Sequence, residues 1–147
     1  MNPVVIAGRW AFSLQVGAIV VAGSRGADYI VLPDDLVLES LTKVQAALPL
    51  DIWGSMFLTA ALVSGLSLAL RKYLIVSVGH GALAGLYLAI GLGALLSTAD
   101  LGYGWRTGLL GVLTGVGFII GAATIHAALA GASLDTFRRR RRELDSG

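Results

Sequence analysis

The stretch that decides the fold is residues 73–99, which reads YLIVSVGHGALAGLYLAIGLGALLSTA and contains no Asp, Glu, Lys or Arg. A helix needs roughly 20 predominantly apolar residues to cross a hydrocarbon core about 30 Å thick. This run of 27 residues exceeds that length, and it is bounded by Arg71 and Lys72 on one side and by Asp100 on the other. It therefore predicts a membrane-spanning helix.

The sequence on either side repeats this pattern. Residues 52–70 and 107–134 also lack Asp, Glu, Lys and Arg and are long enough to span a bilayer. Of the whole chain, 56% is hydrophobic and only 14% is charged, whereas a soluble domain carries about 25% charged residues. We expect an all-α integral membrane bundle of four transmembrane helices, at about residues 4–23, 52–70, 73–97 and 105–130.

The first of these spans leaves two interpretations open. Its apolar run, residues 10–24, reaches spanning length only with residues 3–8 added and with Arg9 near one end, where an arginine can extend to the headgroups. The same stretch fits a secretory signal with small residues at positions 22–24, where cleavage can occur. We expect a retained helix, with a cleaved signal as the alternative.

The one sizeable polar stretch, between Arg25 and Asp51, predicts an amphipathic helix at about residues 34–48. Pro33 suits the start of a helix, and the acidic residues that follow it suit the positive end of the helix dipole. Apolar residues then recur at spacings of four, three and four: they are Val37, Leu41, Val44 and Leu48. Such a helix would lie on the bilayer surface, in the first extracytoplasmic loop.

Basic residues set the predicted orientation. If the N terminus is cytoplasmic, eight basic residues lie on the cytoplasmic side and three lie outside, which satisfies the positive-inside rule. We expect a multi-pass protein of the cytoplasmic membrane with both termini in the cytoplasm, residues 1–134 as the transmembrane domain and 135–147 as a basic tail. The residues expected to fix this topology, or alternatively to bind anionic lipid, are Arg71, Lys72, Arg138, Arg139, Arg140, Arg141 and Arg142.

Small residues recur every four positions along the third span. Such stripes let helix backbones approach closely in lipid, where no hydrophobic force drives helices together. The expected packing residues are Ser77, Gly81, Gly85, Ala89 and Gly93, with Gly111, Gly115, Gly117 and Gly121 of the fourth span as the complementary surface. Packing within one chain explains the stripe, and self-association between chains is the further interpretation.

The two histidines, His80 and His126, both fall inside spans that run in opposite directions. Counted from the charged flanks, both lie in the cytoplasmic half of the membrane, so the two rings can meet. Neutral imidazoles hydrogen-bonded between helices are the plain interpretation. Proton or metal binding is the alternative, although two histidines without carboxylate or thiolate neighbours make an incomplete metal site.

Several classes of function find no support in the sequence. The chain has no cysteine, no acidic residue within its spans, no phosphate-binding loop and no catalytic or zinc-binding motif. Five of its eleven basic residues form one run, Arg138 to Arg142, rather than a face for nucleic acid. We expect no enzymatic activity, no cofactor, no metal and no nucleic-acid partner. The expected partners are the lipid bilayer and either further copies of the chain or another membrane protein.

In organisation the chain resembles the small polytopic, holin-like membrane proteins of actinobacterial phages. The resemblance rests on its length, its Gly- and Ala-rich spans, the opening of the second span, Asp51-Ile52-Trp53-Gly54, and the short basic tail. It implies a protein that accumulates in the cytoplasmic membrane, self-associates and permeabilises it. Two alternatives remain: a non-lytic partner subunit or exclusion factor, and a small channel or carrier that uses the two histidines.

Overall fold

The computed structural model describes residues 3–31, 42–100 and 108–146, and it describes side chains for residues 12–31, 43–97 and 119–146. These segments form five helices: α1 (Pro3–Val31), α2 (Thr42–Ala47), α3 (Leu50–Ala69), α4 (Tyr73–Asp100) and α5 (Gly108–Asp145). The described segments contain no strand. The prediction of an all-α chain is therefore confirmed.

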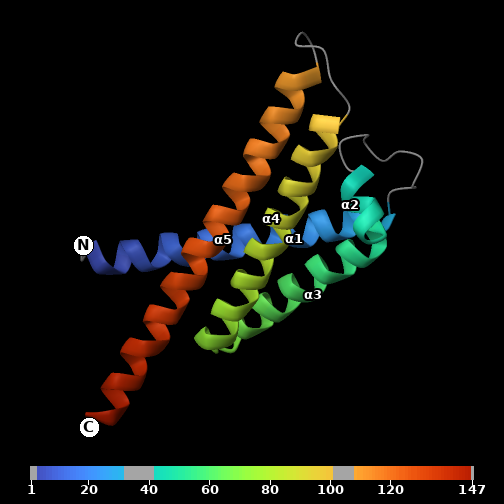
Figure 1. Cartoon of the computed structure of the whole chain (residues 1–147). Coiled ribbons are helices and arrows are strands. Elements are labelled where there is room, and N and C mark those ends of the chain that lie inside the picture. Colours follow the sequence, from blue (N-terminus) through green and yellow to red (C-terminus); the bar gives the residue numbers. More distant parts are fainter. Residues whose placement is uncertain (1–2, 32–41, 101–107, 147) are drawn as a thin grey trace.

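Three stretches of the described residues are long and apolar enough to cross a membrane. They are Leu50–Ala69, Tyr73–Ser97 and Ile119–Asp145, in α3, α4 and α5. The helix that was expected to be the first span, α1, is not among them, and Figure 1 shows it running crosswise to α4 and α5 rather than alongside them. The structure thus supports the spans expected at 52–70 and 73–97. The stretch found in α5 overlaps the span expected at 105–130 only over residues 119–130.

The boundary of α1 corrects the sequence analysis. We expected a helix that ends near residue 23, but α1 continues to Val31. Its second half is held by α3, because Ala22 and Tyr29 are buried in the core shared with Phe57 and Ala61. Packing against α3 therefore overrides the run of glycine, serine and charged residues at positions 23–28, which alone resembles a loop.

A three-residue turn, residues 70–72, joins α3 to α4. Arg71 adopts a left-handed conformation, with φ of 56°, and the N–H groups of Lys72 and Arg71 donate to the carbonyls of Ser67 (2.8 Å) and Leu68 (3.1 Å). This is a Schellman motif, which satisfies the last carbonyls of α3 and reverses the chain. It makes α3 and α4 an antiparallel hairpin.

The helices α4 and α5 form an antiparallel pair along the long axis of the molecule (Figure 1). The Ser77 hydroxyl donates to the Ala130 carbonyl at 2.7 Å, and Gly91 lies against Ile119 further along. Because α5 has 38 residues, its length is roughly 57 Å at 1.5 Å per residue, well beyond a hydrocarbon core. The basic tail, residues 135–147, therefore begins as a direct extension of this helix, not as a separate segment.

Of the predicted amphipathic helix at 34–48, only the end lies within the described residues. There α2 spans Thr42–Ala47, and residues 34–41 lie outside the described part of the chain. Val44 is buried against Gly93 of α4, and its carbonyl accepts the Trp53 indole N–H at 3.2 Å. The contacts of α2 therefore hold it against the ends of α4 and α3.

Candidate functional site

The centre of the bundle contains the two histidines. His80 of α4 and His126 of α5 are both buried, and their Nδ1 atoms are 2.8 Å apart. The structure thus brings together the pair that the sequence placed at similar depth. No group of three or more His, Asp or Glu residues that could hold a metal ion occurs among the described residues.

This hydrogen bond constrains how the protons are distributed. A neutral imidazole has one N–H and one bare nitrogen, so one ring must carry its proton on Nδ1 and the other on Nε2. In the described residues, the buried Nε2 of His80 has no hydrogen-bond partner. The neutral pair therefore forms one N–H···N hydrogen bond between the two Nδ1 atoms, and it leaves one buried polar atom of His80 unsatisfied.

Aromatic rings continue from this pair through the core. Tyr87 stacks on His126 with ring centroids 5.5 Å apart, and Phe57 meets Tyr87 edge to face at 4.8 Å. Tyr29 then packs against Phe57 at 6.2 Å. The Tyr87 hydroxyl, like Nε2 of His80, is buried without a hydrogen-bond partner among the described residues. This row of rings joins α1, α3, α4 and α5, and sequence analysis identified only its two histidines.

The small residues of α4 divide into two groups. The space beside Gly79 and Gly93 is filled by other helices of the same chain. A Cβ added at Gly79 would meet the Ser64 side chain of α3, and one added at Gly93 would meet the Val44 side chain of α2. An added Cβ at Gly81 or Gly85 would have no atom within 4 Å. Ala89 is exposed as well. We call Gly81, Gly85 and Ala89 the open face of α4.

The remaining members of the predicted packing set have different environments. Ser77 contacts α5 through its hydroxyl. Gly121 of α5 is exposed and has open space around it. Gly111, Gly115 and Gly117 lie in α5, but their surroundings fall outside the described side chains. In the part of α5 where side chains are described, the expected complementary surface is thus represented by Gly121.

A groove runs beside the open face, between α3 and α4. It has a volume of about 750 Å³, and its walls include Met56, Thr59 and Val63 of α3 together with Ala82 and Gly85 of α4. A second hollow of about 450 Å³ lies between α1 and α5, where Gly17, Gly121 and His126 contribute to its wall. Both hollows are lined mainly by apolar groups.

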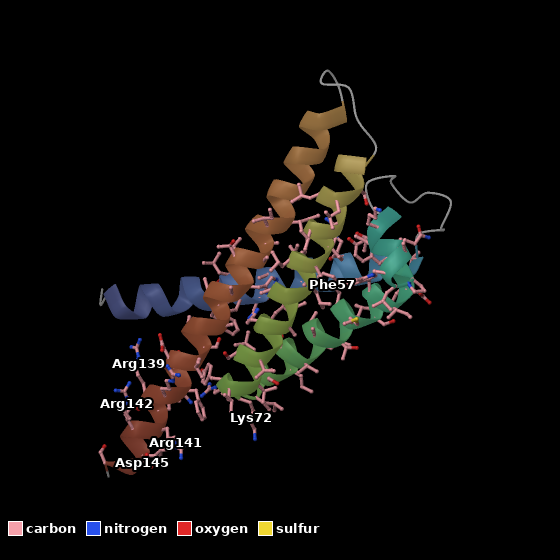
Figure 2. All side chains as sticks on the ribbon, in the orientation of Figure 1. Phe57, Lys72, Arg139, Arg141, Arg142 and Asp145 are labelled. Atoms are coloured by element: carbon pink, nitrogen blue, oxygen red, sulfur yellow. The ribbon has the colours of Figure 1, made fainter. Side chains whose placement is uncertain are left out.

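The expected basic residues gather at the end of the bundle that holds the α3–α4 turn. Arg71 and Lys72 on the turn and Arg140 and Arg141 on α5 line one pocket. Figure 2 shows Lys72 and Arg141 at this end, with Arg139 and Arg142 projecting from the other side of α5. The structure therefore separates the basic run into residues that face the turn and residues that face away from it.

Sequence analysis missed the close backbone contact between α1 and α3. Gly26 of α1 faces Gly54 of α3 so tightly that a Cβ added at Gly54 would lie 2.6 Å from the Gly26 carbonyl oxygen. Only glycine permits backbones to approach so closely. Gly26 follows Ala18 and Ala22 at a spacing of four, a period that the sequence analysis did not consider, whereas Gly54 has leucine four positions away on both sides.

Comparison with protein-family models, curated proteins and solved structures found no match for this chain.

Proposed function

We propose that this chain is a non-enzymatic, multi-pass protein of the cytoplasmic membrane whose copies associate through the open face of α4 and thereby permeabilise the membrane. The observation that carries this proposal is the contrast along α4. Side chains of the same chain pack against Gly79 and Gly93, whereas a Cβ added at Gly81 or Gly85 would have no atom within 4 Å. The second pair is therefore available to a helix of another molecule.

The bilayer makes this face suitable for association. Lipid tails are as apolar as the side chains they contact, so helices in a membrane associate through close packing and through backbone contacts that small residues permit. Gly81, Gly85 and Ala89 follow the small-xxx-small spacing of such contacts. The exposed side chains of Val78, Leu88 and Leu92 flank this strip and would pack around an approaching helix.

Two features of the molecule favour another copy of the same chain as the partner. The groove between α3 and α4 continues the open face and widens the area on which a helix can lie. Gly121 on α5 is a second exposed glycine with open space around it, so the chain carries two surfaces that can meet in different copies. Each surface can meet its equivalent in another copy, as in isologous contacts, so copies linked through both surfaces can form assemblies larger than dimers, as permeabilisation requires.

The test is inducible expression in a bacterium, with membrane potential as the readout. The unaltered chain is expected to collapse the potential and arrest growth. Gly85→Leu is expected to prevent both, because the leucine separates neighbouring copies, while its Cβ has no atom of its own chain within 4 Å. Gly131→Leu is the matched control, since Gly131 is an equally open glycine on α5 outside this face. Depolarisation by Gly85→Leu equal to that by Gly131→Leu would contradict the proposal.

A neutral phenotype for the unaltered chain would favour the alternative of a non-lytic partner subunit or exclusion factor. Such a protein would use the same open face to hold a different membrane protein. Copurification of that protein with the unaltered chain, and its loss from Gly85→Leu, would identify this case.

The histidine pair favours a second candidate function, that of a small channel or carrier that moves protons. When an additional proton binds to one of the two rings, the Nδ1 atoms, 2.8 Å apart, allow a proton to pass to the other ring. Proteoliposomes with an imposed pH gradient test this candidate. Proton flux that His80→Ala abolishes and Gly85→Leu leaves unchanged would support it, and flux that is unchanged in His80→Ala would exclude it.

A further inference from the structure

A pocket of about 440 Å³ lies between the α3–α4 turn and the end of α5. Its charged lining consists of four cations: Arg71 and Lys72 from the turn, and Arg140 and Arg141 from α5. These pairs are distant in the sequence and meet because α5 continues as a helix to Asp145. The pocket is therefore a product of the fold, and the basic run alone would not make it.

No ion pair neutralises the cations of this pocket within the described part of the chain. None of the lining residues is acidic. The one ion pair found among the described residues joins Arg138 to Asp135 at 4.0 Å, outside the pocket. Four like charges held close together repel one another, so a bound anion would relieve this repulsion as well as form new contacts.

Two of the cations are held in place by the protein itself. The Arg140 guanidinium lies over the Tyr73 ring, 4.8 Å from its centroid, in a cation–π contact. Arg71 occupies a left-handed position, with φ of 56°, where helices usually place glycine. An arginine in this conformation is less stable than a glycine would be. Strained backbone positions of this kind are concentrated at ligand-binding sites.

The apolar part of the lining indicates what kind of anion would fit. Leu74, Phe137 and Leu144 also contribute to the pocket, and Leu74 lies in the second position of a candidate membrane span. A ligand that touches both parts must have an anionic head and a hydrocarbon tail. Basic pockets at the ends of membrane helices bind lipid headgroups that carry more than one phosphate in this way.

We propose that this pocket is a binding site for an anionic phospholipid whose headgroup carries two phosphates, with the phosphates on the four cations and an acyl chain along Leu74 and Phe137. Two phosphodiesters match the four unpaired cations better than one. The proposal shares only the membrane location with the proposed function, because the pocket lies at the end of the bundle and includes no residue of the open face.

The test is lipid binding to the purified full-length chain in detergent, measured by native mass spectrometry and by the shift in thermal unfolding. Cardiolipin, with two phosphates, is expected to bind at least ten-fold more tightly than phosphatidylglycerol, with one. Inorganic pyrophosphate is the arm that tests a soluble source of the same chemistry, and we expect no shift with it. A shift equal to that with cardiolipin would overturn the assignment to a lipid.

Matched double variants test whether the pocket or the overall charge is responsible. R140Q/R141Q removes two cations from the pocket, and R139Q/R142Q removes two from the other side of the same helix. Diffuse attraction to the lipid predicts equal losses for the two, whereas the pocket predicts at least a ten-fold greater loss of cardiolipin affinity for R140Q/R141Q. Equal losses would overturn the proposal.

A third variant keeps the test valid if the double variants of α5 misfold. Lys72→Gln alters the turn side of the pocket and leaves α5 intact, and we expect it to weaken cardiolipin binding as well. Unchanged cardiolipin affinity in Lys72→Gln would contradict the site. Gly85→Leu is expected to bind cardiolipin normally, which distinguishes failure of this site from failure of the proposed self-association.

Discussion

At the residue scale, the small residues of α4 show what sequence periodicity can and cannot predict. The spacing of four predicted a packing stripe from Ser77 to Gly93. Because each step of four advances 400°, the stripe turns around the helix, and its members meet different surroundings. Ser77 and Gly93 contact other helices of the chain, and Gly81 and Gly85 contact none. Which members stay open depends on neighbours that only the tertiary structure supplies.

Substitution of Gly54 tests the close backbone contact between α1 and α3. In Gly54→Ala the new Cβ would lie 2.6 Å from the Gly26 carbonyl oxygen, so α1 and α3 must separate. We expect the free energy of unfolding to fall by about 1–3 kcal/mol, the usual cost of overpacking. Unfolding in mixed micelles, followed by tryptophan fluorescence, measures this change.

Gly17→Ala is the control for that measurement. It adds the same methyl group to α1 at a position with no atom within 4 Å, and it should not lower stability. Unfolding of Gly54→Ala and Gly17→Ala at the same detergent concentration would contradict the described packing of α1 on α3.

The histidine pair is best tested by a double-mutant cycle of His80→Ala and His126→Ala. Because the two rings bond to each other, the destabilisation in the double variant should be smaller than the sum of the single effects. The expected coupling energy is about 1 kcal/mol, within the range of side-chain hydrogen bonds between membrane helices. Strictly additive effects on the free energy of unfolding would show that the two rings do not interact.

At the scale of elements, helix boundaries were predictable where charged residues flank an apolar run. The boundaries of α3 and α4 lie close to those expected from sequence, because Asp51, Arg71, Lys72 and Asp100 stand at the ends of apolar runs. The length of α1 was not predictable, since the contact of Gly26 with Gly54 maintains a helix through a polar sequence. The crosswise position of α1 (Figure 1) depends on the same contact.

The basic pocket requires α5 to continue unbroken beyond its contact with α4, and a proline substitution tests this requirement. Thr136 lies between the contact of Ala130 with Ser77 and the cations of the pocket. Thr136→Pro would remove one backbone hydrogen bond and clash with the Ala132 carbonyl, at a cost of about 3 kcal/mol to the helix. We expect Thr136→Pro to lose cardiolipin binding and Thr136→Ala to retain it, by native mass spectrometry. Retained binding in the proline variant would show that α5 need not be continuous to form the pocket.

At the scale of the whole molecule, the chain combines a closed interior with open outer surfaces. The row of rings from Tyr29 to His80 and the glycine contacts fix the interior. Large apolar side chains such as Leu62 and Leu66 remain exposed, as expected for a surface that faces lipid. Composition predicted this overall character, but the division of the outer surface into a lipid-facing part and a face for association required the structure.

Single-cysteine crosslinking in native membranes tests the association of copies most directly, because the chain has no cysteine of its own. A disulfide requires Cα atoms within about 7 Å of each other, which only closely packed helices achieve. Ala89→Cys, on the open face, is expected to give a disulfide-linked dimer after oxidation. Leu62 of α3 is 70% exposed and does not line the groove beside the open face. Leu62→Cys is therefore expected to stay monomeric. A monomeric Ala89→Cys, or equal dimer from both variants, would contradict association through the open face of α4.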